Sequence, residues 1–449
     1  MFFAASAVAT AIDWCIVGSF VIYLLLMLGI GFVFSKKQEN MGDYFLGGRR
    51  MNKWVVALSA QASDMSGWLL MGLPGAVYVG GFSEAWIGIG LGIGTYLNWK
   101  IVAHRLRRYS QACGDAITIP DFISNRFRDQ SGIARIVAAL IILVFFTFYT
   151  ASGFVAAAKL FSSMFSMPYM TALWIGAIVV VSYTLLGGYM AVCWTDFIQG
   201  SLMFVAIVLV PAIVVCNAGG FADTVDSLNQ INGNLLNLFT AANTGKACGF
   251  IGLASCMAWG LGYFGMPHIL VRFMSIDNPA EVKGSRRIAM TWVTISLGAA
   301  VVIGLVFHLW LKQNGITLEQ VGNDPERCFM VMINGIFNSN VLARVFAGVL
   351  LSAIMAAINT RVASRHGQNR GRRAIAHAKP HAFSPSLVRA STDTRVSFRH
   401  LEKSTAFLRD GDHRLCLCLQ GVDPDPEEFP PKNRDKGVKV DTSLLSCVA

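Results

Sequence analysis

Apolar stretches long enough to cross a membrane recur along most of the chain, separated by shorter polar segments. A helix needs about twenty predominantly apolar residues to span the hydrocarbon core of a bilayer. By this criterion the pattern predicts about nine transmembrane helices, at residues 12–35, 54–78, 82–102, 133–159, 168–187, 190–216, 248–267, 288–311 and 341–358. After residue 360 no apolar run of that length occurs. The pattern therefore predicts an all-α polytopic membrane domain over residues 1–360, followed by a tail over residues 361–449.

Composition supports this class and excludes others. The chain is 54% hydrophobic and 14% charged, with a mean hydropathy of +0.53, whereas soluble domains carry about 25% charged residues. The formal net charge of +11 belongs partly to the tail and partly to loops between spans, so it indicates no nucleic-acid partner. The ten cysteines have the spacing of neither a disulfide framework nor a zinc site. No nucleophile–base or metal-site motif occurs, and we expect that the chain is not an enzyme.

One acidic residue, Asp64, lies inside the predicted span 54–78, which contains no Lys or Arg. A carboxylate near the middle of the bilayer costs about 2.5–3.5 kcal/mol on insertion scales and is usually kept for a partner. A mobile cation, Na⁺ or H⁺, fits this role, because nearby glycines and Pro74 loosen the helix and expose carbonyl oxygens. The alternative is that Asp64 bonds a neighbouring helix and only stabilises the bundle.

The distribution of basic residues predicts the orientation. Basic residues concentrate in every second loop, as the positive-inside rule requires; one example is the segment after span seven, which contains Arg272. This pattern places the N-terminus outside and the tail in the cytoplasm. Glu84 and Asp196 lie near span ends, where solvation at the interface is the simpler account and a functional carboxylate is the alternative.

Other signals have structural interpretations. The glycine pattern at 260–265 matches a dinucleotide-binding motif, but it lies inside a span with no preceding strand. The glycines at 88, 90, 92 and 94 predict close helix packing. Trp259 and Tyr263 are one α-helical turn apart and should share a face, either as helix packing or as the wall of a substrate cavity.

Several segments resemble the sodium/solute symporter family, most closely its sodium/proline members. The longest is SAQASDMSGWLLMGLPGAVY (59–78), and further matches in order are YFLGGRRM (44–51), SEAWIGIG (83–90), NWKIVAHRLR (98–107), FFTFYTASG (145–153), CWTDFIQGSLM (193–203), WGLGYFGMPHILVRFM (259–274) and GVLLSAIMAAI (348–358). The resemblance covers about residues 15–358. It implies an inverted-repeat transporter fold of five plus five helices with discontinuous helices, which imports L-proline together with Na⁺ across the plasma membrane.

The resemblance also implies roles for individual residues. The Na⁺ ligands would be Ala62, Asp64, Met65 and Ser66, with the backbone carbonyls of Ala62 and Met65 as donors. The substrate would contact Ser66, Gly67, Trp68, Tyr149, Trp259, Tyr263 and Pro267, and Arg49 would serve coupling. One departure is Met266, where the proline members usually carry Gln. A family sibling that carries another small amino acid or organic solute is therefore an alternative.

The resemblance ends abruptly after Ile358. The family continues its helix there with a Ser-Thr pair that completes the Na⁺ site, whereas this chain continues with Asn359, Thr360 and Arg361. We expect the second repeat to be truncated after about nine helices, with residues 361–449 as an out-of-frame or disordered cytoplasmic tail. A non-functional truncated copy is a further alternative to an active transporter.

Overall fold

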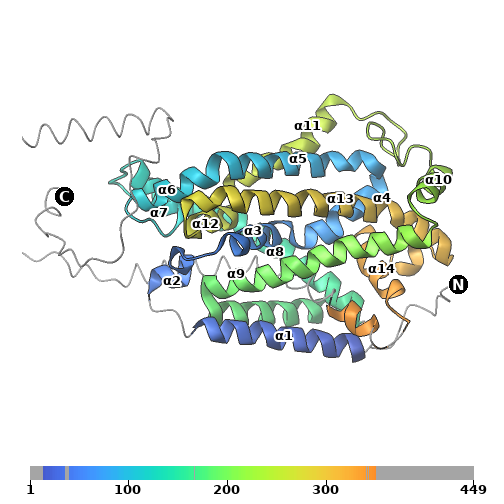
Figure 1. The fold of residues 1–449 in the computed structure, drawn as a ribbon, viewed down its shortest axis with the longest axis horizontal. Coiled ribbons are helices and arrows are strands. Elements are labelled where there is room, and N and C mark those ends of the chain that lie inside the picture. The colour runs from blue at the N-terminus through green and yellow to red at the C-terminus, as the bar shows by residue number, and fades with distance from the viewer. Residues whose placement is uncertain (1–13, 36–39, 166, 340, 342, 350–449) are drawn as a thin grey trace, which may run out of the picture. The chain divides into compact units, whose positions relative to one another are not determined.

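The computed structural model describes residues 14–35, 40–165, 167–339, 341 and 343–349 (Figure 1). Within these ranges the chain is helical, and its β-structure is limited to two isolated bridges, Met51 with Ile276 and Thr240 with Ala247. The expected all-α class is confirmed for this part of the chain. Residues 350–358 of the last predicted span, the predicted domain boundary at residue 360 and the tail lie outside the described residues, and so does the expected truncation.

The predicted span that carries Asp64 forms three helical pieces in a row. Helix α3 covers Lys53–Gly67, the π-helix η2 covers Trp68–Gly72, and α4 covers Leu73–Gly80. The expected loosening after Asp64 is therefore a wide π-helical turn and not an unwound strand of backbone. Pro74 supplies no N–H and so weakens the regular ladder beside this turn. Such π-turns occur frequently at functional sites.

The helices before and after this segment follow the predicted spans with shifted ends. The first span is α1 (Trp14–Ser35), followed by α2 (Met41–Leu46) and the short 3₁₀ turn η1 (Gly47–Arg49). The third span begins with η3 (Gly81–Glu84) and α5 (Ala85–Leu97) and then continues through the π-helix η4 (Asn98–Ala103) into α6 (His104–Ala112). Arg105, Arg107 and Arg108, which follow the third predicted span, are thus helical and do not lie in a loop. Helix α7 (Ile119–Arg126) completes this connection.

Two predicted spans are joined end to end. Helix α8 covers Ile133–Phe165, and α9 runs from Tyr169 to Asn217 with one kink at Gly188. At Gly188 the backbone has φ 59° and ψ −165°, a conformation that only glycine adopts without strain. The kink separates the predicted spans 168–187 and 190–216, so the expected loop between them is a single distorted position. Helix α10 (Phe221–Ile231) follows α9.

The last described elements surround a second broken helix. Helix α11 (Phe250–Ala258) leads into the 3₁₀ segment η5 (Trp259–Gly265), and α12 (Pro267–Ser275) follows after Met266. The predicted end at residue 267 is therefore a break inside a longer helical segment. Next come η6 (Pro279–Glu281), α13 (Val282–Asn314), η7 (Glu319–Val321), η8 (Pro325–Arg327) and α14 (Cys328–Ile336). Helix α14 was not predicted, and its Phe329, Met330 and Ile333 are buried in the core.

Helix α13 packs against α3, α4, α5 and α9 and forms the centre of this arrangement (Figure 1). The predicted close packing of the glycines in α5 is confirmed at two positions. A Cβ atom added at Gly90 would collide with the backbone of Met257, and one added at Gly94 would collide with the backbone of Gly260. At Gly92 an added Cβ would meet no atom within 4 Å, so this glycine is not explained by packing.

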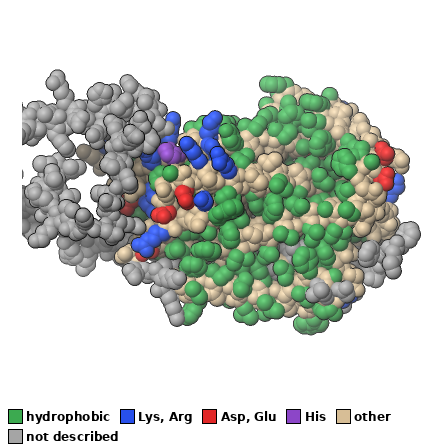
Figure 2. All heavy atoms as spheres, viewed as in Figure 1, with side chains coloured by type: hydrophobic (Ala, Val, Ile, Leu, Met, Phe, Trp, Pro, Cys, Tyr) green, Lys and Arg blue, Asp and Glu red, His purple; other side chains and the backbone are tan. Residues whose placement is uncertain are grey.

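The described residues contain five helices long and apolar enough to cross a membrane, by length and composition: Trp14–Phe34, Trp68–Ala112, Ile133–Ser162, Gly188–Asn217 and Pro279–Asn314. A shorter apolar helical segment covers Phe250–Gly265. On the face shown in Figure 2, hydrophobic side chains cover most of the surface, and Lys and Arg gather towards the end where α6 and α7 lie. This distribution is typical of a protein whose middle faces lipid and whose ends face water.

Candidate functional site

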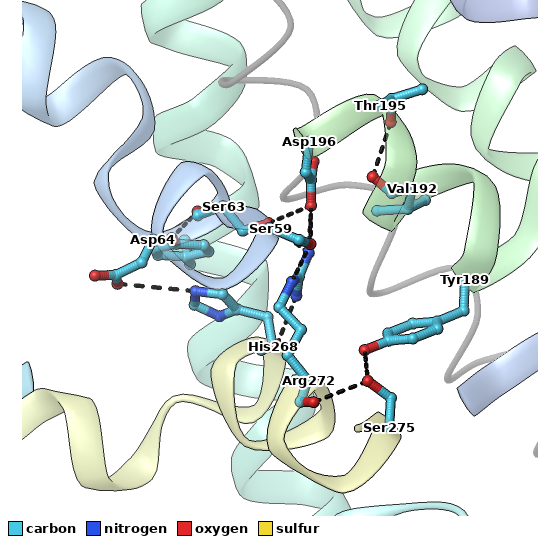
Figure 3. A network of polar contacts seen from close by, with 11 residues as sticks. Ser59, Ser63, Asp64, Tyr189, Val192, Thr195, Asp196, His268, Arg272 and Ser275 are labelled. Carbon is cyan, nitrogen blue, oxygen red and sulfur yellow. Dashed lines mark hydrogen bonds and ion pairs between the residues drawn. The ribbon is translucent and has the colours of Figure 1, made fainter. Parts of the chain in front are cut away.

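Asp64 lies in the last turn of α3, directly before the π-turn. Its side chain is 6% exposed, and His268 Nε2 lies 3.9 Å from its Oδ1 (Figure 3). His268 belongs to the first turn of α12 and stacks on Tyr149 of α8, with ring centroids 5.3 Å apart and planes at 24°. The carboxylate is therefore enclosed where α3, α8 and α12 meet, at the breaks of two interrupted helices.

The neighbouring residues of α3 bring oxygen atoms to the same place. The Tyr149 hydroxyl donates a hydrogen bond of 3.3 Å to the carbonyl of Ser63. The carbonyl of Met65 accepts the backbone N–H of Trp68, which leaves a second lone pair on that oxygen. Ala62 and Met65 are both buried. The side chain of Ser66 lies outside the described residues, and Gly67 is buried at the end of α3.

Two tryptophans connect the broken helices. Trp68 of η2 and Trp259 of η5 are stacked, with ring centroids 5.2 Å apart and planes at 28°. Trp259 is 51% exposed, whereas Tyr263 is 4% exposed and its hydroxyl lies 3.9 Å from the Met65 sulfur. The expectation that Trp259 and Tyr263 share a face is wrong, because the segment is 3₁₀-helical and residues four apart then differ by about 120° in direction.

A buried ion pair beside Asp64 was missed by the sequence reasoning. Asp196 of α9 and Arg272 of α12 are 0% and 1% exposed, and Arg272 Nη2 lies 2.7 Å from Asp196 Oδ2 (Figure 3). The hydroxyls of Ser59 and Ser63 donate to the same oxygen at 2.6 Å and 2.9 Å. The guanidinium also donates to both serine hydroxyls and, at 2.6 Å, to the carbonyl of His268.

This network corrects two expectations. Asp196 was expected at a solvated span end, and Arg272 was expected in a basic loop after span seven. Both are buried, because α9 continues through its kink and α12 continues for two turns beyond Pro267. The available signal was the apolar sequence on either side of Arg272, in ILVRFM, which suits a buried helix better than a loop. Glu84, the other acid near a span end, is half-buried in η3.

Ser63 joins the two clusters. Its carbonyl accepts Tyr149, its hydroxyl donates to Asp196, and its neighbour in the chain is Asp64. Within the described residues no group of three or more His, Cys, Asp and Glu side chains could hold a metal ion. The site instead combines one carboxylate with hydroxyl and carbonyl oxygens, which are ligands for a hard cation.

Arg49, ten residues before Ser59 in the chain, contacts the other end of α12. Its backbone is left-handed, with φ 53°, and its guanidinium donates to the carbonyls of Met274 at 2.8 Å and Ala116 at 2.9 Å. It also pairs with Asp115 at 3.0 Å. Burial lowers the pKa of Arg49, and the charge of Asp115 opposes this shift. The contacts connect η1 with α12 and with the segment between α6 and α7.

The backbone reinforces this junction. The N–H of Met51 donates to the carbonyl of Ser275 at 3.2 Å, and the N–H of Asp277 donates to the carbonyl of Met51 at 3.1 Å. Arg107 of α6 donates to the carbonyls of Ile276 at 2.5 Å and Asp277 at 2.9 Å. The start of α3 and the end of α12 are thus held together by main-chain and arginine contacts.

The sequence of this chain is similar to a known family of membrane proteins. A sequence profile of the sodium:solute symporter family matches residues 44–367. The chain is 45% identical over 335 residues to a sodium/proline symporter of Escherichia coli (strain K12), covering 75% of this chain and 64% of that protein. It is 47% identical over 339 residues to a high-affinity proline transporter of Bacillus subtilis (strain 168), covering 76% and 68%. The chain therefore spans about two thirds of the length of these relatives.

A solved structure shows the same fold. The substrate-bound, outward-open state of a Na⁺-coupled sialic acid symporter superposes with a TM-score of 0.62 at 21% identity, covering 78% of this chain and 71% of that one. The match of the family profile over most of the chain and the identity to curated relatives agree with the apolar helices and the two helix breaks. The chain is a multi-pass membrane protein that belongs to the sodium:solute symporter family.

Proposed function

We propose that the protein is a secondary transporter that couples Na⁺ entry to the import of L-proline across the plasma membrane. The observation that carries this proposal is the buried carboxylate of Asp64 at the break of α3, in a chain whose relatives at 45–47% identity are proline transporters. Interrupted helices whose ends meet in mid-membrane are the usual place for ion and substrate sites in transporters.

The proposed Na⁺ site lies at the end of α3. Asp64 would supply the negative charge, the carbonyls of Ala62 and Met65 would supply neutral oxygens, and Ser66 would supply a hydroxyl. The low exposure of Asp64 supports this assignment, because a carboxylate removed from water gains most from a bound cation. His268 Nε2 lies 3.9 Å from Asp64 Oδ1, which is longer than a hydrogen bond.

The proposed proline site lies beside the ion site. Trp68 and Trp259 would offer flat apolar surfaces to the pyrrolidine ring, and Trp259 is half-exposed, as a cavity wall requires. Tyr149, Tyr263, Pro267 and Gly67 would complete the wall. Ser66 and Trp68 belong to the same helical segment as Asp64, so an ion bound at Asp64 would order the π-turn that presents the substrate residues. This shared segment is the proposed physical basis of coupling.

The wider architecture is proposed on the same basis. The likeness to a solved symporter supports the five-plus-five inverted repeat with discontinuous helices, and the alternation of basic loops supports an N-terminus outside and a cytoplasmic tail. Arg49 would act at the cytoplasmic end. Its contacts with the end of α12 support a role in the movement that opens the inner side, at a distance from the bound ion.

A sibling substrate is the second candidate. Met266 sits at the break between η5 and α12, directly before Pro267, and packs partly buried against the core. A methionine there offers no strong hydrogen-bonding group to a polar substrate. This observation favours another small, apolar amino acid or organic solute if proline is not transported.

Uptake of labelled L-proline into a bacterium that lacks proline transport tests the proposal. The full chain should accumulate proline in Na⁺ medium and not in choline medium. Asp64→Asn should abolish Na⁺-dependent uptake, whereas Asp223→Asn, which removes an exposed carboxylate on α10, should leave it unchanged. Competition by unlabelled amino acids separates proline from a sibling solute. Sodium-independent uptake, or full activity of Asp64→Asn, would contradict the proposed ion site.

A further inference from the structure

A cluster of one aromatic and two cationic side chains lies where α5 and α13 meet near one end of the bundle; we call it the Tyr96 cluster (Tyr96, Lys100 and Arg286). Lys100 Nζ lies 5.6 Å from the centroid of the Tyr96 ring, and the guanidinium carbon of Arg286 lies 5.7 Å from it. The two cations come from different elements, η4 and α13. Each lies within cation–π range of the same ring, so two positive charges are held close together.

This charge is not balanced by the protein within the described residues. Neither Lys100 nor Arg286 forms an ion pair there, and the acid Glu281, at the end of η6 directly before α13, is paired with Lys53 at 3.6 Å. Two like charges on one ring repel each other. The Tyr96 cluster is therefore a site of concentrated positive charge that an anion would stabilise.

An exposed apolar stripe runs from the cluster along the bundle. Ile93 and Ile89 stand one and two helical turns before Tyr96 on the same face of α5, and both side chains are exposed. Helices α5 and α13 are neighbours, with Gly88 of α5 facing Leu297 of α13. Figure 2 shows Lys and Arg side chains at this end of α5 and α13, next to hydrophobic surface.

We infer that the Tyr96 cluster binds the phosphodiester headgroup of an anionic phospholipid, with the acyl chains against the exposed stripe of Ile89 and Ile93 on α5. The chemistry of the site matches both halves of such a lipid. Lys100 and Arg286 would donate to phosphate oxygens, Tyr96 is of a residue type enriched at membrane interfaces, and the stripe is apolar. Basic pockets between membrane helices bind anionic headgroups on this principle.

The two positive charges of the Tyr96 cluster favour a lipid with a net negative headgroup over a zwitterionic one. A phosphatidylcholine headgroup carries its own cation and leaves the two protein charges uncompensated, whereas phosphatidylglycerol brings a net negative charge. The inference rests on the chain's place in a membrane and not on the solute it transports, so it stands or falls separately from the proposed function.

Native mass spectrometry of the purified full chain tests the inference. The protein is titrated with phosphatidylglycerol or phosphatidylcholine of identical acyl chains, and the dissociation constants are compared for Lys100→Gln/Arg286→Gln and for the control Lys283→Gln/Arg287→Gln. The control removes two exposed charges at the start of α13, on either side of Arg286 in the sequence. Because each cation near an anionic surface contributes about 1 kcal/mol, the cluster variant should bind phosphatidylglycerol about 30-fold more weakly.

The expected pattern is tight binding of phosphatidylglycerol by the unmodified chain and the control, and weak binding by the cluster variant. Equal losses in the cluster variant and the control would show unspecific attraction and overturn the inference. Equal affinity of the unmodified chain for phosphatidylglycerol and phosphatidylcholine would also overturn the inference. If the double variant does not fold, Lys100→Gln and Arg286→Gln alone should each weaken phosphatidylglycerol binding about fivefold, and an unchanged affinity in both would also overturn it.

Discussion

Neutralising Asp196 should destabilise the folded protein strongly. In Asp196→Asn the side chain keeps its shape and can still accept hydrogen bonds from Ser59 and Ser63, but Arg272 loses its counter-charge. Arg272 is 1% exposed and its Nη2 lies 2.7 Å from the carboxylate, so water cannot replace the lost charge. Removing one partner of a buried ion pair costs about 3–5 kcal/mol. At about 2–4 °C per kcal/mol, the melting temperature should fall by about 6–20 °C.

Thermal unfolding in detergent with a thiol-reactive dye measures this shift. Cys193 and Cys328 are buried, so their reaction with the dye reports loss of the core. The double variant Asp196→Asn/Arg272→Met should lose clearly less stability than the two single variants lose together. The reason is that the double variant leaves no unpaired buried charge. A coupling free energy of about 1–3 kcal/mol is expected for residues in direct contact.

An exposed ion pair provides the matched control. Lys53 and Glu281 lie 3.6 Å apart, with side chains 40% and 39% exposed, and pairs of this kind contribute about 1 kcal/mol or less. Lys53→Gln should therefore shift the melting temperature by no more than a few degrees. The reasoning fails if Asp196→Asn melts within the range of this control, or if the double variant equals the sum of its singles.

Two further predictions concern packing and pH. Gly94→Ala should destabilise the protein by about 1–3 kcal/mol, because its Cβ would collide with the backbone of Gly260, whereas Gly92→Ala meets no neighbour within 4 Å and should be neutral in the same melting assay; equal effects would contradict the packing argument. At the start of α8, a hydrogen bond from Ser131 and the backbone N–H of Ala134 lower the pKa of Asp129 below its usual 3.8. The stabilisation that ionised Asp129 gives the folded state is therefore complete above pH 3.8, and it is lost as the pH falls through the lower pKa of the folded state. The melting temperatures of the unmodified chain and Asp129→Asn should accordingly differ at neutral pH and converge in acid. A difference that stays constant with pH would refute this.

The sequence predicted the all-helical class and several of the long apolar helices, such as α1, α8 and α13, because bilayer thickness and apolar length leave few alternatives. It also singled out Asp64, since an acid in an apolar run is conspicuous. What a helix does at its break was harder to predict. The π-turn at Trp68–Gly72 and the 3₁₀ segment at Trp259–Gly265 depend on contacts with neighbouring helices, which periodicity along one helix does not contain.

The ion pair of Asp196 and Arg272 was missed for a related reason. Each residue stands near a predicted span end, and a charge there is normally solvated. Only the three-dimensional packing of α9 and α12 against α3 shows that the two charges face each other. The pairing depends on residues 76 positions apart in the chain, and a single sequence carries no sign of such a distant contact.

The junction of Met51 with Ser275 and Asp277 gives α3 the properties of a lever. Asp64 is 13 residues beyond Met51 in the chain, which at 1.5 Å per residue corresponds to an arm of about 20 Å. A rotation of about 5° at the junction would displace the carboxylate by about 1.7 Å. This displacement is sufficient to close or double the gap between a ligand oxygen and a small ion. A modest change in angle at one end of the helix would thus open or close the proposed ion site at the other.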